Sequence, residues 1–249
     1  MNIKEILNKD LEVQKIQMSA DSTITDKKGR TVISPLMSSS FLYLICGPSG
    51  SGKTNLMISL LKNCKCAKDS KHKKTYYGMF DNVIVVSPSL HTVKNDIFND
   101  MDDSKKFKKL SEEVFETINS LHEEGKHMLL ILDDVSSELK QKEILHDLIV
   151  LTKNRRHKGA GLSIIIIGHR ISDYPVGIRA NASLIMLFKP KTKKEQEFIY
   201  EQFINLSKEQ YANLLDHIYK GRFDFLTIDT SLRNSNNFLF YRNFNLLEF

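Results

Sequence analysis

The chain has 249 residues, 41% of them hydrophobic and 27% charged, with a formal net charge of +6. This balance is typical of a globular protein with one elaborated domain or two small ones, and no apolar run reaches the roughly 20 residues of a transmembrane helix. Met1–Ile6 lacks the apolar region of a signal peptide, and three cysteines do not suggest a disulfide framework, so we expect a protein of a reducing compartment that is not secreted.

Residues 1–40 mix polar and apolar side chains and are expected to form an N-terminal strand or hairpin leading into one domain, residues 41–249. From residue 41, apolar runs alternate with helix-like patterns, which predicts an α/β fold with a mainly parallel central sheet flanked by helices. Because strands buried on both faces are apolar throughout, we expect strands at Phe41–Cys46, Asn82–Ser87, Met128–Leu132, Leu162–Gly168 and Ser183–Phe188. Helices are expected near residues 53–63, 111–124 and 138–154.

The last part of the chain, about residues 193–249, is expected to be a C-terminal elaboration of the same domain. Lys193–Ile204 and Ser207–Tyr219 have helical patterns, and the second begins with a capping-box sequence. Phe223–Asp229 and Phe238–Tyr241 have strand patterns around a polar turn. The tail is therefore predicted to contain two helices followed by a β-hairpin.

A complete phosphate-binding motif, G-x-x-x-x-G-K-[ST], lies between the first predicted strand and the first predicted helix. Its residues are Gly47, Pro48, Ser49, Gly50, Ser51, Gly52, Lys53 and Thr54. We expect Gly47, Gly50 and Gly52 to take backbone angles closed to other residues, so that successive N–H groups and the next helix N-terminus face a phosphate. Lys53 is expected to reach the β- and γ-phosphates and Thr54 to bind Mg²⁺, with Asn55 in the same nucleotide site.

Met128–Asp134 is an apolar strand that ends in two carboxylates, which is the form of a Walker B element. The carboxyl ends of parallel strands face the crevice where ligands bind. We therefore expect Asp133 to hold Mg²⁺ beside Thr54, and Asp134 to polarise the water that attacks the γ-phosphate. The alternative, for this segment alone, is a buried strand that merely ends in polar residues.

Polar residues also follow the predicted strand Leu162–Gly168. His169 is expected to sense the γ-phosphate or orient water; the alternative is a strand-end histidine without chemistry. Upstream, the run Lys153–Gly159 could offer an arginine to the γ-phosphate of a neighbouring subunit, where it would stabilise transition-state charge. Binding of nucleic-acid phosphate is the competing interpretation of that run. A further arginine, Arg179, follows within Gly177–Asn181.

Positive charge is concentrated in four clusters along the chain. One such cluster alone is more often a solvated surface than a contact surface, but four on one nucleotide-binding domain make a nucleic-acid groove a hypothesis. The clusters are Lys68–Lys74, Lys105–Lys109, Lys153–Lys158 and Lys189–Lys194.

The predicted strand Asn82–Ser87 lies between the phosphate loop and Asp133 in sequence. This arrangement fits P-loop ATPases in which another strand separates the two motif strands in the sheet. It disfavours nucleoside-monophosphate kinases and GTPases. The sequence contains neither a guanine-reading Asn-Lys-x-Asp motif nor a Leu-Ser-Gly-Gly-Gln signature. Adenine is therefore favoured over guanine, and a transporter-type ATPase is disfavoured.

Taken in order, these motifs resemble the FtsK–HerA superfamily of DNA-pumping ATPases. Within it, the chain is most similar to the poxvirus-type genome-packaging ATPases of large DNA viruses and their relatives in virophages and mobile elements. The resemblance runs from about residue 40 to the end of the chain. It is carried by Gly47–Thr54, Asp81–Pro88, Leu132–Asp134, Arg156–His157, His169, Ile178–Asn181, Phe225–Asp229 and Phe240–Phe244.

The resemblance implies a RecA-like P-loop fold and an ATP-driven motor that moves double-stranded DNA into a preformed capsid. It implies ATP and Mg²⁺ as cofactors and a homo-oligomeric ring, either a hexamer or a pentamer. A capsid portal or vertex protein would be the partner, and the host cytoplasm, a viral factory or the virion the location. By position, Arg156 or Arg179 would be the arginine that acts in trans.

Two residues depart from the family pattern. The chain has His169 where glutamine is usual, and Asp134 where many relatives in the wider superfamily have glutamate. Two other functions therefore stay open. One is a helicase or plasmid-transfer ATPase of the same superfamily. The other is a nucleotide-switched assembly subunit that binds ATP and turns it over slowly.

Overall fold

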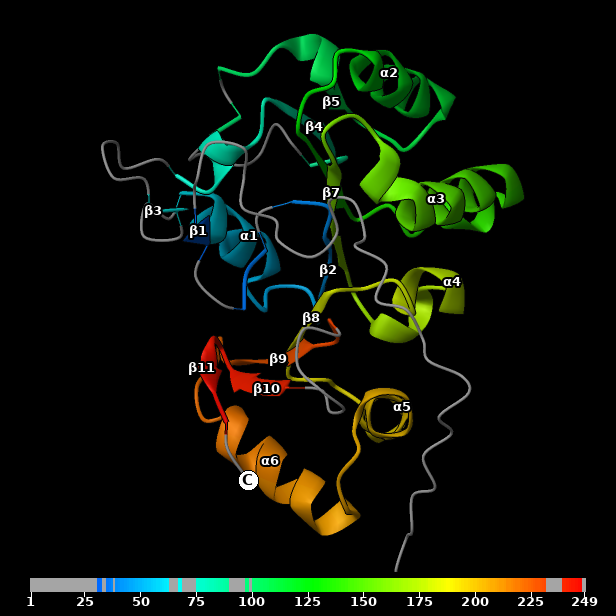
Figure 1. Cartoon of the computed structure of the whole chain (residues 1–249). Helices are drawn as coiled ribbons and strands as arrows, with labels where there is room; N and C mark the ends of the chain where they lie inside the picture. Colours follow the sequence, from blue (N-terminus) through cyan, green and yellow to red (C-terminus); the bar gives the residue numbers. More distant parts are fainter. Residues whose placement is uncertain are drawn as a thin grey trace, which may run out of the picture.

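The computed structural model describes residues 31–32, 35–37, 39–62, 67–68, 75–89, 97–98, 100–231 and 239–247. Within these residues the chain forms one nine-stranded sheet with helices on both faces (Figure 1). A separate two-stranded sheet pairs β1 (Thr31–Val32) with β3 (Ala67–Lys68). Most of the predicted N-terminal segment, the cluster Lys68–Lys74 beyond its first residue, and the turn between the last predicted strands lie outside the described residues.

The large sheet confirms the predicted α/β class. Its order is β11-β10-β9-β8-β2-β7-β6-β4-β5, and the six strands from β8 to β5 are parallel to one another. The parallel strands are β2 (Leu42–Cys46), β4 (Asn82–Val86), β5 (Lys106–Phe107), β6 (Met128–Asp133), β7 (Leu162–Gly168) and β8 (Leu184–Phe188). The antiparallel strands at one edge are β9 (Phe225–Asp229), β10 (Leu239–Arg242) and β11 (Asn245–Leu246).

Six α-helices are found in the described residues. They are α1 (Lys53–Lys62), α2 (Glu112–Glu123), α3 (Lys142–Asn154), α4 (Val176–Arg179), α5 (Lys193–Phe203) and α6 (Lys208–Ile218). The prediction of a single helix near residues 138–154 is wrong for the first turn. Glu138–Lys140 forms a separate 3-10 helix. Gln141 has an extended backbone, with φ −81° and ψ 118°, and this interrupts the helical pattern before α3 begins.

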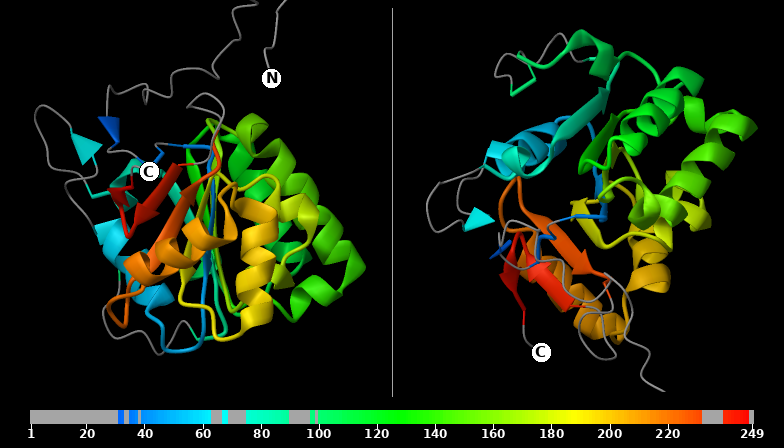
Figure 2. Two further views of the ribbon diagram at one scale, coloured as in Figure 1. Left: turned by 90° about the horizontal axis from the view of Figure 1, so that it is seen from below. Right: turned by 45° about the horizontal axis from the view of Figure 1, so that its top comes forward.

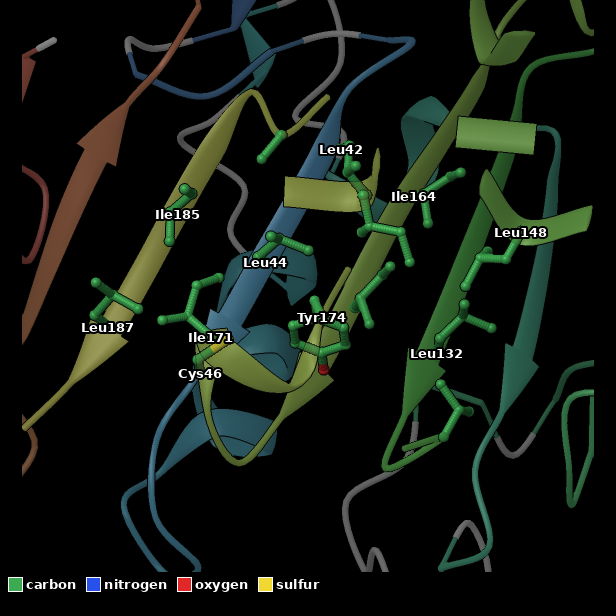
Figure 3. Packing of buried hydrophobic residues seen from close by; sticks show 14 of the residues in the cluster. Leu42, Leu44, Cys46, Leu132, Leu148, Ile164, Ile171, Tyr174, Ile185 and Leu187 are labelled. Atoms are coloured by element: carbon green, nitrogen blue, oxygen red, sulfur yellow. The ribbon is translucent and has the colours of Figure 1, made fainter. Parts of the chain in front are cut away.

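The core is divided by the sheet into two layers. Alternate residues of a strand point to opposite faces, so Leu42, Leu44 and Cys46 pack with α2–α6 on one face (Figure 3). Tyr43 and Ile45 pack with α1 and the segment 75–80 on the other face. Figure 2 shows the green-to-yellow helices and the blue α1 on opposite sides of the sheet. Burial on both faces is why the central parallel strands β2, β4, β6, β7 and β8 are almost entirely apolar.

The two motif strands are not neighbours. β7 lies between β2, which leads into the phosphate loop, and β6, which ends at Asp133. This confirms the predicted separation. The parallel registers pair Cys46 with Gly168, and Ile167 with Asp133, so the carboxyl ends of these strands lie along one edge of the sheet. We call this edge the phosphate edge.

The C-terminal part adds strands to the same sheet. Ser207 caps α6 through the predicted capping box with Gln210. β8 runs toward the phosphate edge, and the register of β8 with β9 pairs Phe188 with Phe225. Because α5 and α6 bring the chain back to the edge where β8 ends, β9 starts there and is antiparallel to β8. None of the described helices combines the length and apolar character needed to cross a membrane.

Candidate nucleotide-binding and hydrolysis site

The phosphate loop connects the buried strand β2 to the first turn of α1. Gly50 and Gly52 have φ values of 74° and 103°, as expected for residues that turn the backbone around a phosphate. Gly47 differs from this prediction, because its φ is not positive. A Cβ atom on Gly47 would lie 2.6 Å from Cβ of Phe188, so the position needs glycine for close packing against β8.

Lys53 is the first residue of α1, and its ammonium group is held over the loop. Its Nζ donates hydrogen bonds to the carbonyl oxygens of Gly47, at 2.8 Å, and Pro48, at 3.0 Å. Burial lowers the pKa of Lys53, whereas the nearby carboxylates of Asp133 and Asp134 act in the opposite direction. The charges of the two carboxylates therefore act on the Lys53 ammonium above the phosphate loop, as expected if all three side chains belong to one nucleotide site.

Asp133 is the last residue of β6, and its carboxylate is oriented from the neighbouring strand. The hydroxyl of Ser87, directly after β4, donates a hydrogen bond of 3.1 Å to Oδ2 of Asp133. Burial raises the pKa of Asp133, and the charge of Asp134 adds to this effect, while the bond from Ser87 opposes it. Sequence reasoning missed this role of Ser87, although a polar residue ending a buried strand was the available signal.

Asp134 turns the chain sharply after β6. Its φ is 56°, in the left-handed region that aspartate and asparagine tolerate better than most residues, and its N–H donates to the carbonyl of Ile167 at 3.1 Å. About half of its side chain is exposed, and Oδ1 lies 3.6 Å from Nε2 of His169. The structure thus brings together the proposed catalytic carboxylate and the proposed sensor, from β6 and β7.

The site's donors fit Mg²⁺. Thr54 supplies a hydroxyl and Asp133 a carboxylate, the hard oxygen ligands that this ion prefers. The carboxylates of Asp133 and Asp134 are adjacent in the chain, so they place negative charge where a cation could neutralise it. Among the described residues, no group of three or more His, Cys, Asp or Glu could hold a metal alone. Mg²⁺ would therefore rely on Thr54, Asp133, phosphate oxygens and water, as is usual for this ion.

The two candidate trans-acting arginines lie in different environments. Arg156 is exposed, in the short 3-10 helix Arg155–His157. Its neighbour Arg155 is buried and donates to the carbonyl oxygens of Ser40, before β2, and Thr152. Burial, with a smaller contribution from the charge of Arg156, lowers the pKa of Arg155 to about 10. Because Arg155 is bonded to Ser40, the adjacent Arg156 lies near the amino-terminal end of β2, about 20 Å of strand length from its own phosphate loop.

Arg179, by contrast, is bound within its own subunit. Its Nε donates to the carbonyl of Tyr174 at 2.8 Å and its Nη1 to Oε1 of Gln202 at 3.1 Å. The guanidinium also lies 4.8 Å from the ring centre of Phe198. These contacts connect α4 with α5. Just after α4, Nδ2 of Asn181 donates a hydrogen bond of 2.7 Å to the carbonyl oxygen of Gly177, within that helix.

Replacing Asp133 with asparagine is expected to increase the free energy of unfolding of the nucleotide-free protein at pH 7. Because the folded-state pKa of Asp133 is raised, its ionisation costs folding free energy above the ordinary pKa of aspartate. The gain should be largest above the raised pKa. It should disappear below the ordinary value, about 4, where both states are protonated. Urea unfolding of both proteins across this pH range would measure it; a gain that does not change with pH would contradict the stated cause.

Comparison with known proteins places this site in a family. The AAA domain model matches residues 37–173, which is more than half of the chain. B204, the DNA-packaging ATPase from Sulfolobus turreted icosahedral virus, has a TM-score of 0.55 and 18% identity, covering 82% of this chain and 98% of B204. The genome packaging NTPase B204 from Sulfolobus turreted icosahedral virus 2, in complex with AMPPCP, also has a TM-score of 0.55, at 17% identity, covering 83% of this chain and 98% of that one.

A third similar structure is EssC (ATPases 2 and 3) from Geobacillus thermodenitrificans, with a TM-score of 0.50 and 12% identity, covering 84% of this chain and 40% of EssC. No curated protein matched the sequence. At these identities the likeness shows the fold alone, and the predicted P-loop α/β fold is confirmed. The matched range includes the phosphate loop, Asp133, Asp134 and His169. The chain therefore belongs to the AAA domain family and is a P-loop ATP hydrolase.

Proposed function

We propose that this protein is an ATP-driven translocase that moves double-stranded DNA into a preformed viral capsid. The observation that carries the proposal is a fold shared along nearly the whole length of B204, a DNA-packaging ATPase. On that fold the phosphate loop, Asp133, Asp134 and His169 occupy the same sheet edge. Together they supply the parts of an ATP-hydrolysing motor.

The chemistry follows from these side chains. The loop N–H groups and Lys53 bind and orient the triphosphate, with the Lys53 ammonium turning from the loop carbonyls to the β- and γ-phosphates. Asp134 accepts a proton from the attacking water, and His169, 3.6 Å from its carboxylate, positions that group or the water. Mg²⁺, held through Thr54 and Asp133, would neutralise charge that develops on the phosphates. Ser87 keeps the Asp133 carboxylate in place.

Asp134→Asn is expected to lower the ATP turnover number by at least about 100-fold, because an amide cannot act as a general base. Asparagine also tolerates the left-handed backbone at this position, so the turn after β6 should be retained. ATP binding should therefore stay within a few-fold of wild type. Turnover is measured by phosphate release and binding by calorimetry; an Asp134→Asn protein that hydrolyses ATP at the normal rate would show that another group activates water.

We propose that a homo-oligomeric ring, a hexamer or a pentamer, completes the site. Arg156 lies at the edge of the sheet opposite its own phosphate loop, so it could reach a γ-phosphate only in a neighbouring subunit. Arg179 has three contacts inside its own subunit and would have to release them to act in trans. The placement of the two residues therefore favours Arg156 as the trans-acting arginine.

Mixing Arg156→Ala subunits into wild-type protein is expected to reduce ATPase activity by more than the fraction of wild-type subunits lost. The reason is that each variant subunit also disables the site of its neighbour. The variant alone should lose at least about 100-fold in rate. Lys153→Ala, an exposed substitution at the end of the preceding helix α3, is the matched control; its subunits should stay active and leave the rate of the mixture unchanged. A linear decline with the fraction of Arg156→Ala subunits would contradict a trans role for this residue.

The DNA contacts are proposed to be mainly with the phosphate backbone, and therefore tolerant of sequence and sensitive to salt. Some lysines of the basic clusters have partners within the chain: Lys105 donates to Asn82, Lys106 pairs with Asp103, and Lys158 donates to Asn119. The cluster Lys189–Lys194 follows β8 at the phosphate edge and is mostly exposed. We propose it as the first DNA-contact segment to test.

A capsid portal or vertex protein is the proposed partner, and the host cytoplasm, a viral factory or the virion the proposed location. The rival functions are separated by the choice of DNA. A packaging translocase should be stimulated by duplex more than by single strands and should not displace strands, whereas a helicase should separate them. Turnover that no DNA stimulates at low salt would favour the slow assembly switch instead.

A further inference from the structure

An exposed aromatic side chain lies beside the phosphate loop. Among the described residues, the exposed large apolar side chains are Val150, Val176, Phe223 and Leu246, and only Phe223 carries a ring. Phe223 is 58% exposed, although it lies between the buried end of α6 and the buried strand β9. An exposed ring in such a place is a surface available for stacking.

Chain topology explains how Phe223 reaches the loop. β8 ends at Phe188 on the phosphate edge, and β9 begins at Phe225 on the same edge, paired with Phe188. The hydroxyl of Tyr219, at the end of α6, donates to the carbonyl of Leu187 at 3.0 Å and holds α6 against the end of β8. The short turn from α6 to β9 therefore lies next to the strand end that borders the phosphate loop.

The turn that carries Phe223 is fixed by hydrogen bonds to one carboxylate. Asp224 accepts from the N–H of Gly221 at 2.7 Å, from Nη2 of Arg242 at 2.8 Å and from Nδ2 of Asn243 at 3.1 Å. The bonds from Arg242 and Asn243 lower the pKa of Asp224 to about 2. Next to it, the N–H of Phe225 donates to Oδ1 of Asn243. The exposed ring thus extends from a turn whose backbone is held in place.

The ring lies beside the loop at Gly52. Cδ1 of Phe223 lies 3.3 Å from the position that a Cβ atom would take on Gly52, which is the residue immediately before Lys53. The guanidinium of Arg222 lies 5.3 Å from the centre of the same ring. An aromatic surface with an adjacent cation thus lies next to the phosphate loop. The base of a nucleotide is covalently connected to the phosphates that such a loop binds.

We propose that Phe223 is the stacking platform for the base of the nucleotide whose phosphates bind Gly47–Thr54, with Arg222 beside it. This inference rests on the proposed function, because it requires the loop to bind ATP. It gives the C-terminal elaboration, α5 to β9, a direct part in nucleotide recognition. Stacking accepts any base face, so Phe223 adds affinity for a base without selecting adenine by hydrogen bonds.

The chain contains no tryptophan, which makes one test direct. Phe223→Trp places the only tryptophan of the chain at the proposed contact, where it can be excited apart from the tyrosines. Addition of ATP should change its emission, whereas inorganic triphosphate, which fills the loop but has no base, should leave the emission unchanged. Emission that stays constant while calorimetry shows ATP binding to the same variant would overturn the base contact, as would an equal change with both compounds.

Affinity provides the second test. Phe223→Ala should weaken ATP binding about tenfold, the size expected for one lost stacking contact. The affinity for inorganic triphosphate should be unchanged. Leu246→Ala, which removes another exposed apolar side chain from a C-terminal strand, is the matched control and should alter neither.

The outcomes separate the two proposals. Wild-type protein that binds neither ATP nor triphosphate would refute the proposed function, and the base contact with it. Wild-type protein that binds ATP with an affinity that Phe223→Ala leaves unchanged would refute the base contact alone. An equal loss of ATP and triphosphate binding in Phe223→Ala would also refute it, since the ring would then only support the loop.

Discussion

Lys53→Ala is expected to abolish ATP turnover, with a loss of at least about 100-fold in rate, while the fold stays intact. The ammonium group of Lys53 lies over the loop, bonded to the carbonyls of Gly47 and Pro48, and would transfer to the phosphates of a bound nucleotide. Alanine has a high helix propensity, so α1 should still form at its first position. Phosphate release at saturating ATP measures the loss.

Lys62→Ala provides a control at the other end of the same helix, where the side chain is exposed. It should hydrolyse ATP at the wild-type rate. Circular dichroism and thermal unfolding of the two variants should match wild type within a few degrees. Normal hydrolysis by a folded Lys53→Ala protein would show that the phosphate loop is not the site of ATP turnover.

Gly168→Ala is expected to destabilise the protein by about 3 kcal/mol, near the upper end of the cost of inserting a methyl group into a packed core. Gly168 is the buried last residue of β7, and a Cβ atom there would overlap the hydroxyl of Tyr174 and lie 2.8 Å from its Cζ. Tyr174 is itself buried and packs beside Ile171 on the sheet face that Figure 3 shows. Because both residues are buried, relieving the overlap would require the surrounding core to shift.

A double variant identifies the cause of that loss. Adding Tyr174→Phe to Gly168→Ala removes the overlapping hydroxyl, so the double variant should be more stable than the sum of the two single effects predicts. Urea unfolding of the four proteins gives the comparison. If Gly168→Ala costs less than about 1 kcal/mol, or if the two effects simply add, the close contact between β7 and Tyr174 would not be what requires glycine.

Much of the fold was predictable because the central parallel strands are buried on both faces. The continuous apolar runs predicted β7 without error, and β2, β4, β6 and β8 to within one residue at an end. The C-terminal helices were predicted from periodicity and from the Ser207 cap. The phosphate loop and the Walker B carboxylates could be predicted because their chemistry requires particular residues at fixed spacing in sequence.

The features that sequence reasoning missed depend on contacts between distant segments or on very short elements. β5 has two residues and α4 has four, which is too few for any periodic pattern to be recognised. The hydrogen bond from Ser87 to Asp133 and the position of Phe223 beside Gly52 both depend on segments that are far apart in the sequence. Gly47 was correctly placed in the loop, but close packing against Phe188 explains it, not its backbone angle.

The arginine candidates show the same limit. Arg156 and Arg179 both follow motif elements in sequence, yet one lies at the edge of the sheet opposite the phosphate loop and the other bridges α4 and α5. Position in sequence could not separate them, because the separation depends on where the crossover from α3 to β7 places the intervening turn. Their roles stay predictions that the mixing experiment addresses.

The most direct test of a DNA-driven, shared-site ATPase is the rate of ATP hydrolysis with and without duplex DNA, measured on fractions whose mass is known from light scattering. The account predicts hydrolysis that duplex DNA stimulates at low salt, that Lys53→Ala abolishes, and that occurs in assemblies of several 28.7 kDa chains. Hydrolysis at an equal rate with and without DNA by a monomer would contradict it.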